Sequence, residues 1–105
     1  MSELSVEDQK LVTLARATIA RTGASEGAAV RDLDGRTYAA ASVELDSLRL
    51  AALEVCVAMA ISSGSRGLEA VVRLGEDHPD LAAVREFGGP GVVVHLGDAR
   101  GQIAS

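Results

Sequence analysis

The chain has 105 residues, of which 48% are hydrophobic, so it can enclose one modest core and we predict a single domain over residues 1–105. Fifteen acidic side chains against ten basic ones give a formal charge of −5, which disfavours binding to nucleic acid or to anionic lipid headgroups. Aromatic residues make up only 2% of the chain, so a stacking surface for bases is not expected either.

Cysteine content and hydropathy indicate the compartment. The single cysteine, Cys56, excludes an internal disulfide and any multi-cysteine metal site, and it favours a reducing environment. The longest apolar run, Leu50 to Ile61, contains a charge at Glu54 and is well short of the roughly 20 residues that span a bilayer. We therefore expect a cytoplasmic protein that binds neither nucleic acid nor membranes.

The first predicted helix covers Ser5 to Arg21 and ends at Gly23. Ser5 is a typical capping residue, two acids follow in the first turn, and apolar residues recur at helical spacing. Two antiparallel strands, Ala28 to Leu33 and Thr37 to Val43, are predicted next. They flank Asp34-Gly35, a dipeptide that strongly favours a tight hairpin turn.

A second helix is predicted to begin at Asp46-Ser47 and to run to Ile61. Apolar residues occur on all its sides, which is typical of a helix buried on all sides. The alternation of apolar residues with Glu69 and Arg73 then predicts a strand over Leu68 to Leu74, with one face better buried than the other. A short helix beginning at Pro79 and ending at Gly88-Gly89, and a last strand over Val92 to Leu96, complete the pattern.

The order of the elements predicts the fold class. Helices and strands alternate in the second half of the chain, which favours right-handed crossovers and parallel pairing there, after an antiparallel hairpin. We expect an α/β fold with three layers, α/β/α, around a mixed sheet of about four strands.

Few residues stand out as chemical candidates. Glu54 is the only charge in the central helix, and its carboxylate is expected either to reach a cleft or to accept hydrogen bonds from nearby backbone. Cys56 is interpreted as a small buried hydrophobe, because no neighbouring cation would lower its pKa. His78 and His95 belong to no metal-ligand pattern, so we interpret them as structural residues.

Several segments taken together carry a resemblance to a known family. Gly27 to Val30, Asp34 to Arg36, Ser42 to Glu44 and Ala52 to Glu54 resemble the small cytidine deaminases in residue type, order and spacing. The likeness extends from the first helix to the last strand and implies a cytidine deaminase-like fold.

The resemblance implies roles for individual residues. Ser42 and Glu44 correspond to a segment that binds the ribose of a nucleoside, with serine in place of the family's asparagine. Ala52 stands where the family has a zinc-binding cysteine, and Glu54 where it has the glutamate that shuttles protons. Asp80 and Ala83, after Pro79, stand where the other two cysteine ligands are expected.

The resemblance therefore implies that zinc is lost, although the family requires it. Three protein ligands and one open position are needed to lower the pKa of bound water from about 15.7 toward 7. Cys56 lies about one helical turn, roughly 6 Å, beyond Ala52, and with Asp80 it does not complete a three-ligand site. We expect no cofactor and no metal.

The resemblance also implies a truncated C-terminus. A turn at Asp98 to Gly101 follows the last strand, and we expect the family's final strand and helix to be missing. The apolar edge from Val92 to Leu96 would then favour pairing with another chain, so we expect a homodimer or homotetramer.

Three functional hypotheses follow. The first is a cytidine deaminase-like protein that has lost zinc and deaminase activity and acts as an oligomeric structural or binding protein. The second is a nucleoside- or nucleotide-binding protein that uses Glu44 and Glu54 without chemistry. The third is an active deaminase-type hydrolase, either with an improvised metal site or with Glu54 as a metal-free general base.

Overall fold

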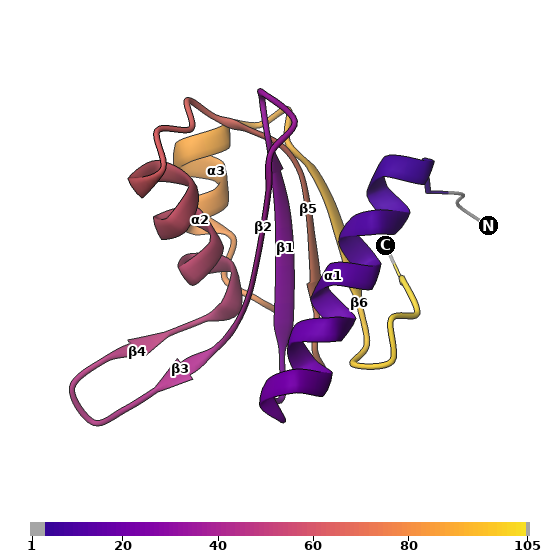
Figure 1. The fold of residues 1–105 in the computed structure, drawn as a ribbon, viewed down its shortest axis with the longest axis vertical. Coiled ribbons are helices and arrows are strands. Elements are labelled where there is room, and N and C mark those ends of the chain that lie inside the picture. Colours follow the sequence, from indigo (N-terminus) through magenta and orange to yellow (C-terminus); the bar gives the residue numbers. More distant parts are fainter. Residues whose placement is uncertain (1–3, 105) are drawn as a thin grey trace.

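A four-stranded mixed sheet lies at the centre of the computed structural model, which describes residues 4–104 (Figure 1). Its strands are β1 (Gly27–Asp32), β2 (Thr37–Ala41), β5 (Leu68–Leu74) and β6 (Val93–Gly97), in the spatial order β2-β1-β5-β6. β1 pairs antiparallel with both β2 and β5, whereas β5 and β6 are parallel. The predicted mixed sheet of about four strands is therefore confirmed.

Helices cover both faces of the sheet, as the predicted α/β/α layering requires (Figure 1). α1 (Val6–Thr22) packs on one face, and α2 (Ala52–Ser62) and α3 (Ala82–Gly88) pack on the other. Alternate residues of β1 and β5 thus point into two separate apolar clusters. The predicted cap is present, because Ser5 Oγ accepts a hydrogen bond from the Asp8 N–H at 3.0 Å.

The β1–β2 hairpin turns where the dipeptide signal placed it. Gly35 has φ +89°, a left-handed conformation that glycine adopts without steric cost. The buried carboxylate of Asp32 accepts hydrogen bonds from the backbone N–H groups of Asp34 and Arg36, each at 2.9 Å. The turn is therefore held by its own backbone and by one buried acid.

The predicted start of the second helix is wrong. Residues 43–50 form a small hairpin of β3 (Val43–Glu44) and β4 (Arg49–Leu50), which projects from the body of the protein (Figure 1). Asp46 and Ser47 lie in its turn, which backbone hydrogen bonds between Leu45 and Leu48 close. Strands of two residues have no periodicity of their own, and the leucines of the hairpin continue the apolar spacing of α2, so the sequence predicted one longer helix. In the structure α2 begins at Ala52, six residues after Asp46.

Two further expectations about the helices need correction. α2 is not buried on all sides, because Ile61 on its outer surface is 52% exposed. The third helix begins at Ala82 and not at Pro79. Asp80 delays it, since its carboxylate accepts a hydrogen bond from the Ala82 N–H at 2.9 Å and so stabilises a turn before the helix.

The β6 edge of the sheet is partly covered. The predicted turn forms, with the Gly101 N–H bonded to the Asp98 carbonyl at 2.9 Å. The chain then returns along β6, where Ile103 bridges Gly97 and the Ala104 N–H bonds to the carbonyl of Leu96. At the other end of β6, Val93 remains 47% exposed. Within residues 4–104, none of the helices has the length and apolar character to cross a membrane.

Candidate functional site

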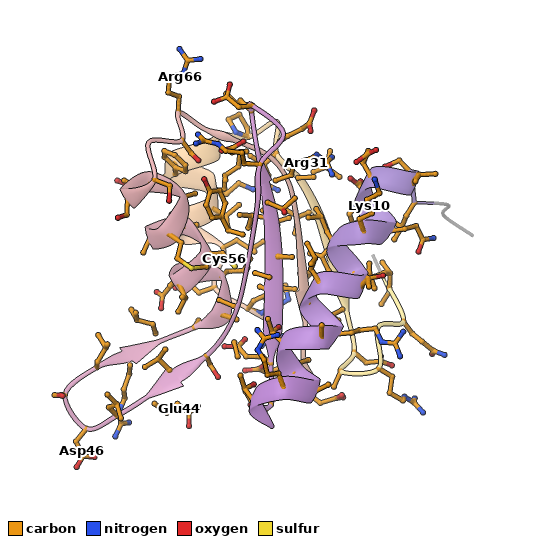
Figure 2. All side chains as sticks on the ribbon, in the orientation of Figure 1. Lys10, Arg31, Glu44, Asp46, Cys56 and Arg66 are labelled. Atoms are coloured by element: carbon orange, nitrogen blue, oxygen red, sulfur yellow. The ribbon has the colours of Figure 1, made fainter. Side chains whose placement is uncertain are left out.

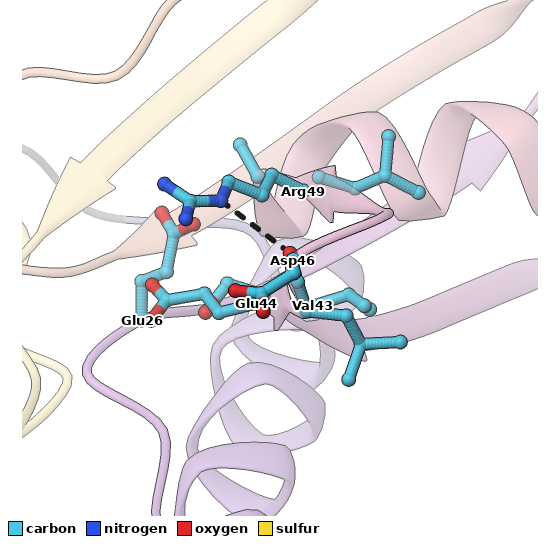
Figure 3. A pocket seen from close by; sticks show the side chains of 9 residues that line it. Glu26, Val43, Glu44, Asp46 and Arg49 are labelled. Carbon is cyan, nitrogen blue, oxygen red and sulfur yellow. Dashed lines mark hydrogen bonds between the residues drawn. The ribbon is translucent and has the colours of Figure 1, made fainter.

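An open pocket of about 530 Å³ lies at the base of the β3–β4 hairpin (Figure 3). Ser42 and Glu44, the two predicted nucleoside-binding residues, both line it. Ser42 is half-buried in the link between β2 and β3, and Glu44 is exposed at the end of β3. The remaining lining residues come from the segment before β1 and from the hairpin: Glu26, Val43, Leu45, Asp46, Arg49, Leu50 and Ala51.

The pocket is predominantly acidic. Glu26, Glu44 and Asp46 contribute three carboxylates, against one guanidinium from Arg49 (Figure 3). Arg49 Nε donates to the carbonyl oxygen of Leu45 at 3.4 Å, which orients the arginine across the hairpin. Carboxylates at the mouth of an open pocket can accept hydrogen bonds from ligand hydroxyl or amine groups.

Glu54 is not among the residues that line this pocket. Its Oε1 accepts a hydrogen bond from the Ala51 N–H at 2.8 Å, across the first turn of α2. Glu54 occupies the third helical position, where an acid commonly satisfies a free N–H and interacts well with the helix dipole. The Glu54 carboxylate was expected either to reach a cleft or to accept hydrogen bonds from nearby backbone, and in the structure it accepts a backbone hydrogen bond.

Glu26 is a site residue that sequence reasoning missed. Its Oε2 accepts a hydrogen bond from the Ala52 N–H at 2.9 Å, and its Oε1 accepts one from Arg73 Nε at 2.9 Å. Arg73 was missed as well, although a cation within the apolar strand β5 is an unusual residue. The two residues are 47 positions apart, so their pairing was not readable from local spacing.

The three positions expected for zinc ligands present few donor atoms. The Ala52 side chain is a fully buried methyl group, and Ala83 packs against the core between the sheet and α2 and α3. The carboxylate of the exposed Asp80 accepts a hydrogen bond from the Ala82 N–H. Among residues 4–104, no three histidine, cysteine, aspartate or glutamate side chains are grouped so that they could hold a metal ion. This donor set does not fit a three-ligand zinc site.

Cys56 lies inside the core between α2 and the sheet (Figure 2). Burial raises the pKa of its thiol to about 12, and the Sγ donates to the carbonyl oxygen of Tyr38 at 3.6 Å. A metal ligand or nucleophile must be a thiolate, which this environment disfavours. The interpretation of Cys56 as a buried apolar residue is confirmed.

The two histidines lie away from the pocket. His78 is exposed in the β5–α3 loop. His95 is on β6, and its Nε2 lies 2.8 Å from Asp8 Oδ2 on the α1 side of the sheet. Burial tends to raise the pKa of Asp8, but hydrogen bonds from Arg31 and His95 hold it below the usual value. His78 therefore lies in a loop and His95 on the last strand, as the sequence predicted.

Comparison with known proteins places these residues in a family context. A family model described as cytidine deaminase-like matches residues 4–101. No significant match was found among curated proteins.

Solved cytidine deaminases share the fold. The enzyme from Burkholderia pseudomallei is 23% identical, with a TM-score of 0.78 over 96% of this chain and 91% of that one. The enzyme from Mycobacterium tuberculosis is 25% identical, with a TM-score of 0.72 over 86% and 85% of the two chains. The enzyme from Mycobacterium leprae is 22% identical, with a TM-score of 0.71 over 95% and 93%.

Proposed function

This chain belongs to the cytidine deaminase-like family, and we propose that it is a member without zinc or deaminase activity that acts as an oligomeric structural or binding protein. One observation carries the proposal. At the first residue of α2, where the resemblance expects a metal-binding thiolate, the protein has the buried methyl group of Ala52, whose N–H is bonded to Glu26.

The chemistry of deamination supports this proposal. When bound, zinc supplies hydroxide by lowering the pKa of water from about 15.7 to about 7. Here Glu54 is bonded to the backbone of its own helix, and the only thiol is protonated and buried. A carboxylate without a metal does not generate hydroxide at neutral pH. In this proposal Glu54 instead stabilises the helix through its hydrogen bond to the Ala51 N–H.

Metal analysis and a cytidine turnover assay on the purified protein test the proposal. We expect zinc at far below one equivalent per chain, and no uridine above the rate without protein. One equivalent of zinc together with uridine production would refute it. Uridine production in the presence of a chelator would instead support the third hypothesis, a metal-free hydrolase that uses Glu54.

Nucleoside binding is the second candidate function, and the open pocket lined by Ser42 and Glu44 favours it. In this proposal the exposed Glu44 carboxylate accepts hydrogen bonds from ribose hydroxyls. A nucleoside at 100 times its dissociation constant should stabilise the protein by about 2.7 kcal/mol, which a thermal-shift screen detects. Glu44→Ala, which removes the acceptor, should abolish the shift, and Glu7→Ala, a surface change on α1, should preserve it. The absence of a shift with every nucleoside excludes this function.

Self-association is part of the leading proposal. The projecting β3–β4 hairpin exposes two leucines, Leu45 at 57% and Leu48 at 47%. Apolar side chains on a projecting arm are typical of contacts between protein chains. We therefore propose a homodimer or homotetramer in which the hairpin contacts another copy, in a cytoplasmic protein that binds neither nucleic acid nor membranes.

A further inference from the structure

A network of charged groups connects the start of α2 to the β5–α3 loop. Glu26 accepts a hydrogen bond from the Ala52 N–H at 2.9 Å and forms an ion pair with Arg73 Nη2 at 2.7 Å. Arg73 Nη1 donates to the backbone carbonyl of Asp77 at 2.5 Å, and Nη2 also binds the Asp77 carboxylate. The guanidinium thus contacts both segments, directly or through one carboxylate.

The Arg73–Glu26 pair of this network is buried, which distinguishes it from an ordinary surface ion pair, whereas the Asp77 side chain is 82% exposed. The side chain of Arg73 is 5% exposed and that of Glu26 is 14% exposed. A desolvated cation is stable only when its N–H groups have partners, and here Nε, Nη1 and Nη2 all donate. Burial tends to lower the pKa of Arg73, but hydrogen bonds to Asp77 and Glu26 raise it above its usual value. Arg73 therefore keeps its charge.

The backbone beside Arg73 also leaves room for the guanidinium. A Cβ atom at Gly75 would lie 2.7 Å from Cζ of Arg73, closer than real side chains approach. Glycine at position 75 is therefore required for Arg73 to keep this conformation.

We propose that Arg73, held by Glu26 and Asp77, performs the structural role of a metal ion by fixing the start of α2 to the β5–α3 loop. Two of the expected ligand positions belong to these segments, because Ala52 is the first residue of α2 and Asp80 follows Asp77 by three residues. A metal bound to both segments would hold them together through coordination. The guanidinium holds the same two segments through hydrogen bonds and charge.

This inference rests on the proposed loss of zinc, but it makes separate claims. It states that the network stabilises the start of α2 and the β5–α3 loop, and that a buried ion pair elsewhere in the protein does not stabilise these two segments to the same extent. Arg31 provides the matched control. Its side chain is 11% exposed and pairs with Asp8 on the opposite face of the sheet, where it connects β1 to α1.

Hydrogen exchange resolves this local effect. Arg73→Met should reduce protection of the hydrogen-bonded amides in these two segments, those of Ala51, Ala52, Val55 and Gly75, by about tenfold or more. Arg31→Met should lower Tm but leave protection of those segments within about twofold of the wild type, after correction for global stability. If Arg73→Met fails to fold, the double variant Glu26→Met/Arg73→Met leaves neither charge unpaired and serves in its place. Unchanged protection, or the same pattern of loss in both arginine variants, overturns the inference.

Reintroducing a metal provides the second test. Ala52→Cys, Asp80→Cys and Ala83→Cys are combined with Glu26→Met/Arg73→Met, and zinc alone is added. We expect zinc to restore Tm and protection of both segments, and Co²⁺ to produce the absorption bands of thiolate ligation. Co²⁺ ligation without restored protection overturns the inference, as does an absence of ligation in a folded variant. Zinc and turnover assays on the wild type test the proposed function independently.

Discussion

The carboxylate of Glu54 and the backbone N–H of Ala51 are joined by a hydrogen bond of 2.8 Å that closes the first turn of α2. Glu54 is the only charged side chain of this helix. The acid that a catalytic role would require to face substrate is therefore already bonded within its own helix. Its contribution can be measured as stability.

Replacing Glu54 should affect stability. Glu54→Ala should lower the free energy of unfolding by about 1 kcal/mol, because the Ala51 N–H loses its acceptor. Glu54→Gln should cost less, since the amide oxygen can still accept that bond. Urea denaturation measures both values. If Glu54→Ala leaves the free energy of unfolding at the wild-type value, Glu54 has no capping role; if it also leaves ligand binding unchanged, Glu54 has no binding role.

Acidification should destabilise the protein through Asp32. Burial tends to raise the pKa of this carboxyl, but hydrogen bonds from Ser65, Arg36 and Asp34 hold it below its usual value. The folded-state pKa is therefore lower than the unfolded value of about 3.9. The stabilisation is fully present above that value and is lost as pH falls through the folded-state pKa.

Asp32→Asn isolates this contribution. The substitution should cost about 2 kcal/mol at neutral pH, because a buried ionised acceptor of several hydrogen bonds is replaced. Its unfolding free energy should also depend less on pH below pH 4 than that of the wild type. Denaturation curves recorded at several pH values test both effects, and parallel pH profiles for the two proteins contradict the assignment.

Cys56 should be unreactive in the folded protein. Its thiol is fully buried and has a pKa of about 12, so very little thiolate exists at pH 8. Labelling with a thiol reagent should be slow in buffer and rapid in denaturant, with the native rate following the unfolding equilibrium. Rapid stoichiometric labelling of the native protein would contradict the buried position.

Acidic substitutions on the hairpin should disrupt self-association. Leu45→Asp/Leu48→Asp should shift the protein toward the monomer in light scattering, because charges would be placed at the proposed contact. The monomer should remain folded, since both leucines are exposed. Leu33→Asp is the control, because Leu33 is 62% exposed in the β1–β2 turn, away from the hairpin (Figure 1). A wild-type monomer at micromolar concentration contradicts the oligomer itself.

Local signals predicted most of the fold. The signals at Ser5, at Asp34-Gly35 and within Leu68 to Leu74 each depend on neighbours within a few residues, and the structure has the expected element at each. The expected alternation of burial in that strand is wrong, because β5 is buried on both faces except at Glu69. The β3–β4 hairpin was missed because a strand of two residues has no periodicity of its own. The start of α3 is displaced from Pro79 to Ala82, because the Asp80 carboxylate accepts a hydrogen bond from the Ala82 N–H and this turn competes with the helix.

The candidate site was only partly predictable. Ser42 and Glu44 were proposed through the resemblance, and they line the same pocket. Glu26 and Arg73 were not found, because each gains its significance from a partner distant in sequence. A charged residue in an otherwise apolar strand, as at Arg73, is the signal that should prompt a search for a buried counter-ion.

The return of residues 102–104 along β6 has a consequence for solubility. Backbone groups near Gly97 and Leu96 are already occupied by Ile103 and Ala104. A strand of a second molecule therefore cannot pair with the whole length of β6 while this segment is in place. This disfavours the repeated addition of strands at that edge, which is how fibrils grow.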